Sequence, residues 1–150
     1  MTHSSLTVWR VAATGGRAVQ LTKTASSMPI ESPDGQYVYF VRFTEGKFRL
    51  WRMRPDGGGE SMVDVMPALR SNGYDWWPVE SGIYFYPETG AKTELDLLDL
   101  RSSRIRRIYT FDKPPAPWLG GLSVSPDGKW LLYSRIDEAA SDLMLVENFR

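Results

Sequence analysis

The sequence predicts an all-β fold made of repeated four-stranded units, and three observations support this prediction. Aromatic residues make up 13% of the 150 residues, and there are 13 Gly and 10 Pro, a combination typical of short strands and tight turns. A Ser-Pro-Asp-Gly segment occurs twice, and an aromatic, apolar stretch follows each copy. The repeat spacing falls close to the roughly 40–50 residues of a β-propeller blade.

The repeat is clearest at residues 32–42 and 125–135, which lie 93 positions apart. Each copy opens with Ser-Pro-Asp-Gly, continues as an apolar strand and ends in Arg. A third copy without Pro-Asp-Gly lies between them at residues 79–86, and its Ile-Tyr-Phe matches Val-Tyr-Phe of the first copy at an offset of 45. The spacing therefore corresponds to one unit of about 46 residues, within the range of propeller blades.

The Ser-Pro-Asp-Gly segment has a physical explanation as a turn. Pro presets φ, Asp accepts a hydrogen bond from the backbone two residues on, and Gly adopts the left-handed conformation without strain. An Asp ligand to calcium is the functional alternative, but a calcium loop needs several oxygen ligands and each turn offers one Asp. We interpret both copies as strand-reversing turns.

Further alternating segments follow each copy, at residues 47–54, 93–100 and 141–147, and a related one opens the chain. Their period of two is that of a strand with one buried face. The predicted strands are 6–11 and 17–22; 26–30, 36–42, 47–54 and 60–66; 74–79, 82–87, 93–100 and 105–110; and 118–124, 129–135 and 141–147. We therefore predict one propeller segment over 1–150, with a partial blade at 1–25 and blades at about 26–70, 71–112 and 113–150, the last without its fourth strand.

Composition argues against several classes of function. Eighteen basic and eighteen acidic residues balance, so nothing favours nucleic acid or an anionic membrane surface. There is no Cys, and the one histidine, His3, lies near the N-terminus, which argues against a catalytic triad, a metal site or a cofactor site built on these residues. We therefore expect a protein without enzymatic activity, without a cofactor and without a membrane-spanning segment. The compartment is not fixed, although the lack of a signal-like N-terminus favours the cytoplasm over the periplasm.

The repeated Ser-Pro-Asp-Gly segments and the Leu-Trp-Arg strand before the glycines at 57–59 resemble the WD40-like (PD40) repeats of TolB-like β-propellers. The stretch 113–150 resembles the closing blade of bacterial TolB-like proteins. The resemblance implies a non-catalytic scaffold that binds protein or peptide, as part of a larger bacterial regulator. It also leaves open the propeller of a prolyl oligopeptidase-type peptidase whose hydrolase domain is absent from this chain.

About three blades cannot close a ring, so two sheet faces should remain open. Exposed apolar faces of this size are interfaces or aggregation hazards. We expect either a homodimer that closes a ring or the upstream blades of a longer chain to cover them. The strand at 17–22 is the candidate to complete the last blade of a second copy.

Aromatic residues at the entries of two predicted inner strands are the candidate binding residues at the mouth of the channel. Packing between blades is the alternative for each Trp. The candidates are Tyr74, Asp75, Trp76, Trp77 and Trp118.

Two charged clusters complete the candidates. Glu94, Asp96 and Asp99 could serve a sugar-active hydrolase or lyase, but a solvated strand face is the favoured explanation for them. The neighbouring basic residues at 101–107 could bind a polyanion or simply balance these acids.

Overall fold

The computed structural model describes residues 6–70, 75–88, 92–116, 121–125 and 127–137, and this part of the chain is all-β. Every assigned element in it is a strand, and two of the sheets contain four antiparallel strands. The predicted fold class, all-β with four-stranded antiparallel blades, is confirmed. The described residues contain no helix of the length and apolarity needed to cross a bilayer.

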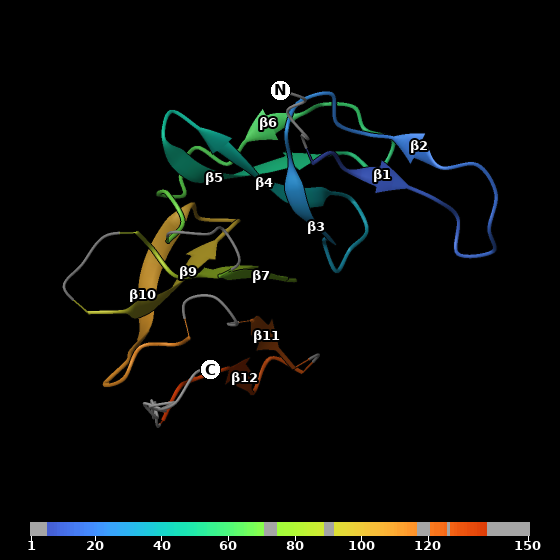
Figure 1. The fold of residues 1–150 in the computed structure, drawn as a ribbon. Helices are drawn as coiled ribbons and strands as arrows, with labels where there is room; N and C mark the ends of the chain where they lie inside the picture. The colour runs from blue at the N-terminus through green and yellow to red at the C-terminus, as the bar shows by residue number, and fades with distance from the viewer. Residues whose placement is uncertain (1–5, 71–74, 89–91, 117–120, 126, 138–150) are drawn as a thin grey trace, which may run out of the picture.

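Four sheets follow one another along the chain, and in each sheet neighbouring strands are consecutive in sequence (Figure 1). The first pair is β1 (Trp9–Arg10) and β2 (Val19–Gln20). The first four-stranded sheet contains β3 (Ser27–Glu31), β4 (Val38–Thr44), β5 (Lys47–Met53) and β6 (Ser61–Met62). The second contains β7 (Trp76–Val79), β8 (Gly82–Phe85), β9 (Glu94–Asp99) and β10 (Arg104–Thr110). The last pair is β11 (Leu122–Val124) and β12 (Leu131–Tyr133).

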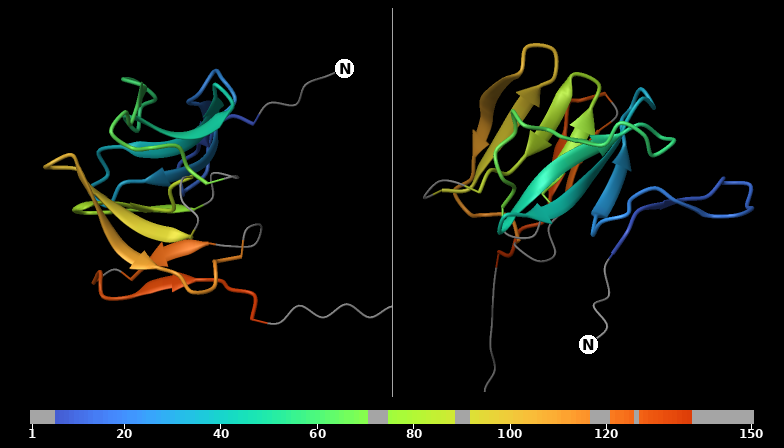
Figure 2. Two further views of the ribbon diagram at one scale, coloured as in Figure 1. Left: turned by 90° about the vertical axis from the view of Figure 1, so that its left-hand side faces the viewer. Right: turned by 90° about the horizontal axis from the view of Figure 1, so that it is seen from above.

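The two four-stranded sheets and the last strand pair stack in chain order, as the left view of Figure 2 shows. The first pair packs the residues at its base on the outer face of the first sheet and projects sideways from it (Figures 1 and 2). The main core lies between the two four-stranded sheets, because alternate residues of each strand point to the same face. Burial of each such large apolar side chain contributes about 1.5–3 kcal/mol. The central members of this core are Tyr39, Val41 and Leu50 from the first sheet and Trp76, Ile83, Phe85 and Leu98 from the second.

Two smaller cores join the end pairs to the stack. Val8 packs with Phe40 and Met53 on the other face of the first sheet. Leu122, with Leu131 packed beside it, joins a cluster that includes Tyr86 and Leu95 of the second sheet. The alternation of apolar residues in the sequence therefore gives each sheet the apolar faces that pack against its neighbours.

Both Ser-Pro-Asp-Gly turns are built as predicted. In the first, the Ser32 hydroxyl donates to Asp34 Oδ1 at 2.5 Å, and the Gln36 amide donates to the same oxygen at 3.0 Å. In the second, the Ser125 hydroxyl and the Lys129 amide bind Asp127 in the same way, at 2.6 and 3.2 Å. The glycines have φ of 68° and 69°, the left-handed values that favour Gly.

Several predicted strands are shorter in the structure. The predicted strand 60–66 reduces to β6, because the chain turns after it and places Met66 and Leu69 in the core between the sheets. The predicted strands 6–11 and 17–22 reduce to two residues each, joined by a connection that contains Gly15 and Gly16. The predicted strand 141–147 lies outside the described residues. The division of the chain into blades stays a prediction, although each observed sheet falls inside one predicted unit.

Candidate functional site

The structure describes three of the five residues predicted to line a binding mouth, namely Asp75, Trp76 and Trp77. Tyr74 and Trp118 lie outside the described residues. Trp76 and Trp77 begin β7, and Asp75 immediately precedes it. β7 is an edge strand because β8 is its one neighbour in the sheet. Their side chains alternate between the two faces of this sheet, so they meet different neighbours.

The two tryptophans pack against opposite neighbours. Trp76 is 1% exposed and lies edge-on to Tyr39 of the first sheet, with ring centroids 6.3 Å apart. Trp77 is half-buried and packs against the cluster that contains Tyr86 and Leu95. Both indoles therefore contribute to packing between sheets. A direct role for either in binding a partner stays a prediction.

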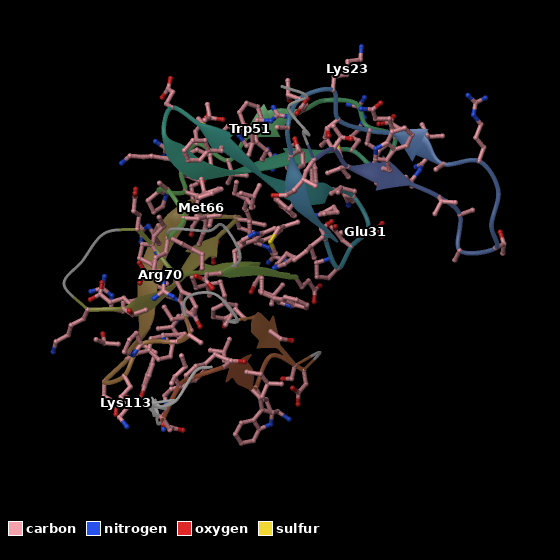
Figure 3. All side chains as sticks on the ribbon, in the orientation of Figure 1. Lys23, Glu31, Trp51, Met66, Arg70 and Lys113 are labelled. Atoms are coloured by element: carbon pink, nitrogen blue, oxygen red, sulfur yellow. The ribbon has the colours of Figure 1, made fainter. Side chains whose placement is uncertain are left out.

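Arg70, which is labelled in Figure 3, organises a polar cluster that includes the buried Asp75. Arg70 Nε lies 3.5 Å from Asp75 Oδ2, and Nη1 donates to Thr93 Oγ1 at 3.2 Å. Nη2 donates to the Pro115 carbonyl at 3.5 Å, and the guanidinium carbon lies 5.6 Å from the centre of the Tyr86 ring. One arginine thus connects the chain after the first sheet, the second sheet and the segment that leads to the last pair.

The Asp75 carboxylate is unusual because it is almost completely shielded from water. Asp75 is 1% exposed, and neither of its carboxylate oxygens has a hydrogen-bond partner among the described residues. Burial raises the pKa of Asp75 to about 6, against the opposing effect of Arg70. The Tyr86 hydroxyl is also buried and has no hydrogen-bond partner in the described part of the chain. Burial is the main cause that raises the pKa of Tyr86, and the charge of Asp75 raises it further. Strongly perturbed groups of this kind occur at functional sites and in structural ion pairs alike.

The acidic residues considered for sugar chemistry have separate partners. Arg107 lies between two of them, with Nη2 at 2.6 Å from Glu94 Oε2 and Nε at 3.3 Å from Asp96 Oδ1. Asp99 instead accepts hydrogen bonds from the backbone amides of Arg101 and Ser102 in the turn between β9 and β10. Two carboxylates therefore share one guanidinium, and the third stabilises a turn. Across the described ranges, no group of three His, Asp or Glu side chains is arranged to hold a metal ion.

The basic residues at 101–107 do not act as one group either. Arg107 is paired with the two acids, whereas Arg101, Arg104 and Arg106 are exposed along β10 and the turn before it. β10 is an edge strand, and charged side chains on an edge discourage pairing with other chains.

Sequence reasoning missed the roles of Arg70 and Tyr86. Arg70 belongs to no motif, and Tyr86 was noted only as the last residue of the third repeat copy. Their contacts with Asp75 depend on segments that meet only in the folded chain. The signal that could have found Arg70 is its position, because it lies four residues before Tyr74, where the predicted aromatic entry to the inner strand begins.

Exposed apolar side chains gather at the two ends of the stack. Twelve large apolar side chains are exposed in the described part of the chain, and eight of them belong to the two end pairs or their flanks. At the N-terminal end they are Leu6, Trp9, Val11 and Val19. At the C-terminal end they are Trp130, Leu132, Tyr133 and Ile136.

No protein-family model and no curated protein matches this sequence. In fold, the chain is similar to TolB from Acinetobacter baumannii, with a TM-score of 0.66 and 15% identity over 86% of this chain and 32% of that one. It is also similar to a putative TolB from Agrobacterium tumefaciens, with a TM-score of 0.58 and 19% identity over 88% of this chain and 51% of that one. The chain thus spans a third to a half of these structures, and the likeness shows a TolB-like propeller fold.

Proposed function

We propose that this chain is a non-catalytic segment of a TolB-like β-propeller that binds protein or peptide partners, within a larger bacterial regulator. The fold is the starting point, because propeller blades present rigid faces and loops and need no bond chemistry to act. Fold alone does not fix function, so the proposal depends on the surfaces that this chain exposes.

The observation that carries the proposal is the concentration of exposed apolar side chains at the two ends of the stack. Both ends are two-stranded in the described residues, where the sheets between them have four strands. Trp9 is 56% exposed at one end and Leu132 is 64% exposed at the other. Covering apolar surface contributes roughly 25 cal/mol per Å², so these ends favour association.

A second propeller face is the partner that fits such ends best. Within the stack, each face is covered by the apolar face of the next sheet, as Val8 covers Phe40 and Met53. A second copy of the chain, or the preceding blades of a longer chain, would present the same kind of surface. Self-association of this chain is therefore part of the proposal.

The contacts of the acidic residues support a non-catalytic role. Glu94 and Asp96 are neutralised by Arg107, and Asp99 is engaged by backbone amides, so each carboxylate already has a structural partner. A general acid or nucleophile in a glycosidase must be free to reach the substrate.

Charged substitutions at the ends test the proposal. Trp9→Asp and Leu132→Asp place a charge at each end, whereas Val65→Asp and Ile105→Asp place one at apolar residues that are also exposed but lie away from the ends. Sedimentation velocity over a concentration series should show that the end variants weaken self-association at least about tenfold, as expected for apolar anchors of an interface. Equal behaviour of all four variants would rule out the ends as the contact surfaces.

A further inference from the structure

The longest open sheet edge in the described part of the chain belongs to β10. This strand is seven residues long and lies at the margin of the second sheet, farthest from β7 (Figure 1). β9 is its neighbour on one side, and the described residues provide no neighbour on the other. An open edge presents a row of unpaired backbone N–H and C=O groups, to which another strand can add.

The other edges of the two four-stranded sheets are less suited to receive a strand. β3 and β7 contain Pro29 and Pro78, and a proline has no N–H to donate to an added strand. β6 is only two residues long. β10 contains no proline, but its register shifts between Arg107 and Tyr109, so its regular stretch is 104–107. Because this stretch is short, its side chains decide which strands can add to it.

The regular stretch carries two arginines without an acidic partner. Arg104 and Arg106 are exposed, and neither forms an ion pair with a described residue. Arg106 lies opposite Leu97 of β9. Arg104 lies opposite Asp99, whose carboxylate already accepts hydrogen bonds from backbone amides. Both arginines point to the same face of the sheet, because alternate residues of a strand share a face.

β9 shows which kind of strand β10 accepts on its paired side. It begins Glu-Leu-Asp-Leu, so acidic and apolar residues alternate there. Arg107 of β10 contacts both acids, with Nη2 at 2.6 Å from Glu94 Oε2 and Nε at 3.3 Å from Asp96 Oδ1. Pairs of opposite charge across neighbouring strands stabilise a sheet. One arginine of β10 thus holds an acidic, apolar strand, and Arg104 and Arg106 are placed to hold another on the open side.

The residue between these two arginines is apolar. Ile105 is 40% exposed and points to the opposite face from its two neighbours. A strand beside residues 104–106 would therefore meet them best with an acidic, an apolar and an acidic residue in turn. A second copy of β10 would bring like charges together, which is destabilising. The charge on this edge thus discourages self-pairing and favours an acidic partner.

We propose that the open edge of β10 binds an extended acidic segment of a partner protein, in which acidic and apolar residues alternate, as an added β-strand. The acidic side chains pair with Arg104 and Arg106, and an apolar side chain packs on Ile105. This edge lies along the side of the stack, so it stays open when the two ends are covered (Figure 2). The proposal therefore goes beyond self-association through the ends and does not depend on it.

Peptide binding to the full chain, followed by fluorescence anisotropy, tests the proposal. The probe is a labelled peptide in which Glu and Val alternate over about eight residues, so that its acids share one face when it is extended. Two control peptides carry the same net charge. One has its Glu and Val residues in separate blocks, and the other has Pro in place of the central Val residues, which interrupts strand pairing. The alternating peptide should bind at least about tenfold more tightly than either control.

Charge reversal locates the site on the protein. Arg104→Glu with Arg106→Glu should weaken binding of the alternating peptide at least about tenfold. The matched control is Arg17→Glu with Lys23→Glu, which reverses two exposed charges away from β10 and should leave the affinity nearly unchanged. The Arg104 and Arg106 variant should instead bind a peptide with Lys in place of Glu, which the native protein should not bind. This gain of binding requires a folded variant, so it separates a lost contact from lost structure.

Three results would overturn the proposal. The first is no binding of the alternating peptide at roughly millimolar concentration, the weak limit of specific recognition. The second is equal affinity for the alternating, block and Pro peptides, or for a single-stranded oligonucleotide, because charge alone would then explain binding. The third is an equal loss in the two charge-reversal variants. Sedimentation velocity should show the same self-association for the Arg104 and Arg106 variant as for the native protein, and a change would contradict the separation of this edge from the ends.

Discussion

Arg70 Nε lies 3.5 Å from Oδ2 of the buried Asp75, and this contact connects the chain that leaves the first four-stranded sheet to the residue immediately before the first strand of the second. The same guanidinium also reaches the carbonyl of Pro115, on the way to the last strand pair. Removing one partner of a buried ion pair leaves an uncompensated charge, which typically costs about 3–5 kcal/mol. The pair is therefore a structural link among three consecutive sheets.

The raised pKa of Asp75 predicts that its contribution to stability falls as pH rises, which is opposite to the usual effect of a carboxyl group whose pKa is lowered by folding. Its pKa is about 6 in the folded state, because of burial, against 3.8 for the exposed group. Between these values the folded state holds a proton that the unfolded state has released, so the contribution of Asp75 to the free energy of unfolding falls as pH rises. Above about pH 6 this contribution stays constant at its lower value.

The variant Asp75→Asn isolates this effect. Other carboxyl groups, such as Asp34 and Asp127, have pKa values lowered mainly by hydrogen bonds from serine hydroxyls, and their contributions are lost as pH falls. Urea unfolding of both proteins across the window from pH 3.8 to about 6 should show that the native protein loses stability relative to the variant as pH rises. A difference between them that does not change with pH would contradict the burial of a titrating Asp75.

Replacing the two neighbouring tryptophans should have unequal effects. Trp76 is fully buried between the four-stranded sheets, so Trp76→Ala should lower the free energy of unfolding by about 3–5 kcal/mol. Trp77 is half-buried at the edge of its cluster, so Trp77→Ala should cost less. Chemical denaturation of both variants measures the difference. A larger loss for Trp77→Ala would mean that the order of burial is incorrect.

Gly82 should not tolerate a side chain. A Cβ at this position would lie 2.1 Å from the backbone oxygen of Leu98 in the neighbouring strand, where nothing can move aside cheaply. Gly82→Ala should therefore lower the free energy of unfolding by about 1–3 kcal/mol or more.

Gly121→Ala is the matched control, because among the described residues a Cβ there would meet no atom within 4 Å apart from its chain neighbours. Thermal unfolding should separate the two variants clearly. Equal melting temperatures would show that β8 and β9 do not approach each other as closely as the structure has them.

The fold was accessible from the sequence because its determinants are local. The repeated turn encodes its own geometry: Ser32 and Ser125 each bind the Asp two residues on, and a Gly follows with a left-handed φ. Strand alternation is equally local, and it separates Tyr39 from Phe40 onto opposite faces. Strand ends were less predictable, because the burial of Met66 and Leu69 between the sheets ends the expected strand at β6 early.

The polar cluster could be predicted only in part. Asp75 was singled out as a neighbour of tryptophans at a strand entry, but its partner Arg70 belongs to no pattern. Their contact is set by how the connection between the sheets lies against the start of β7, and Pro115 and Thr93 come from still other segments. Relationships of this kind depend on long-range packing, which a period of two or a turn motif does not encode.

The solution mass of the chain, measured by light scattering after size exclusion, tests the central claim that its two ends are partner surfaces. A species of at least twice 17.0 kDa, growing with concentration, is the predicted result. A single species of 17.0 kDa at every concentration would contradict it, because the exposed apolar ends would then be stable in water without any partner.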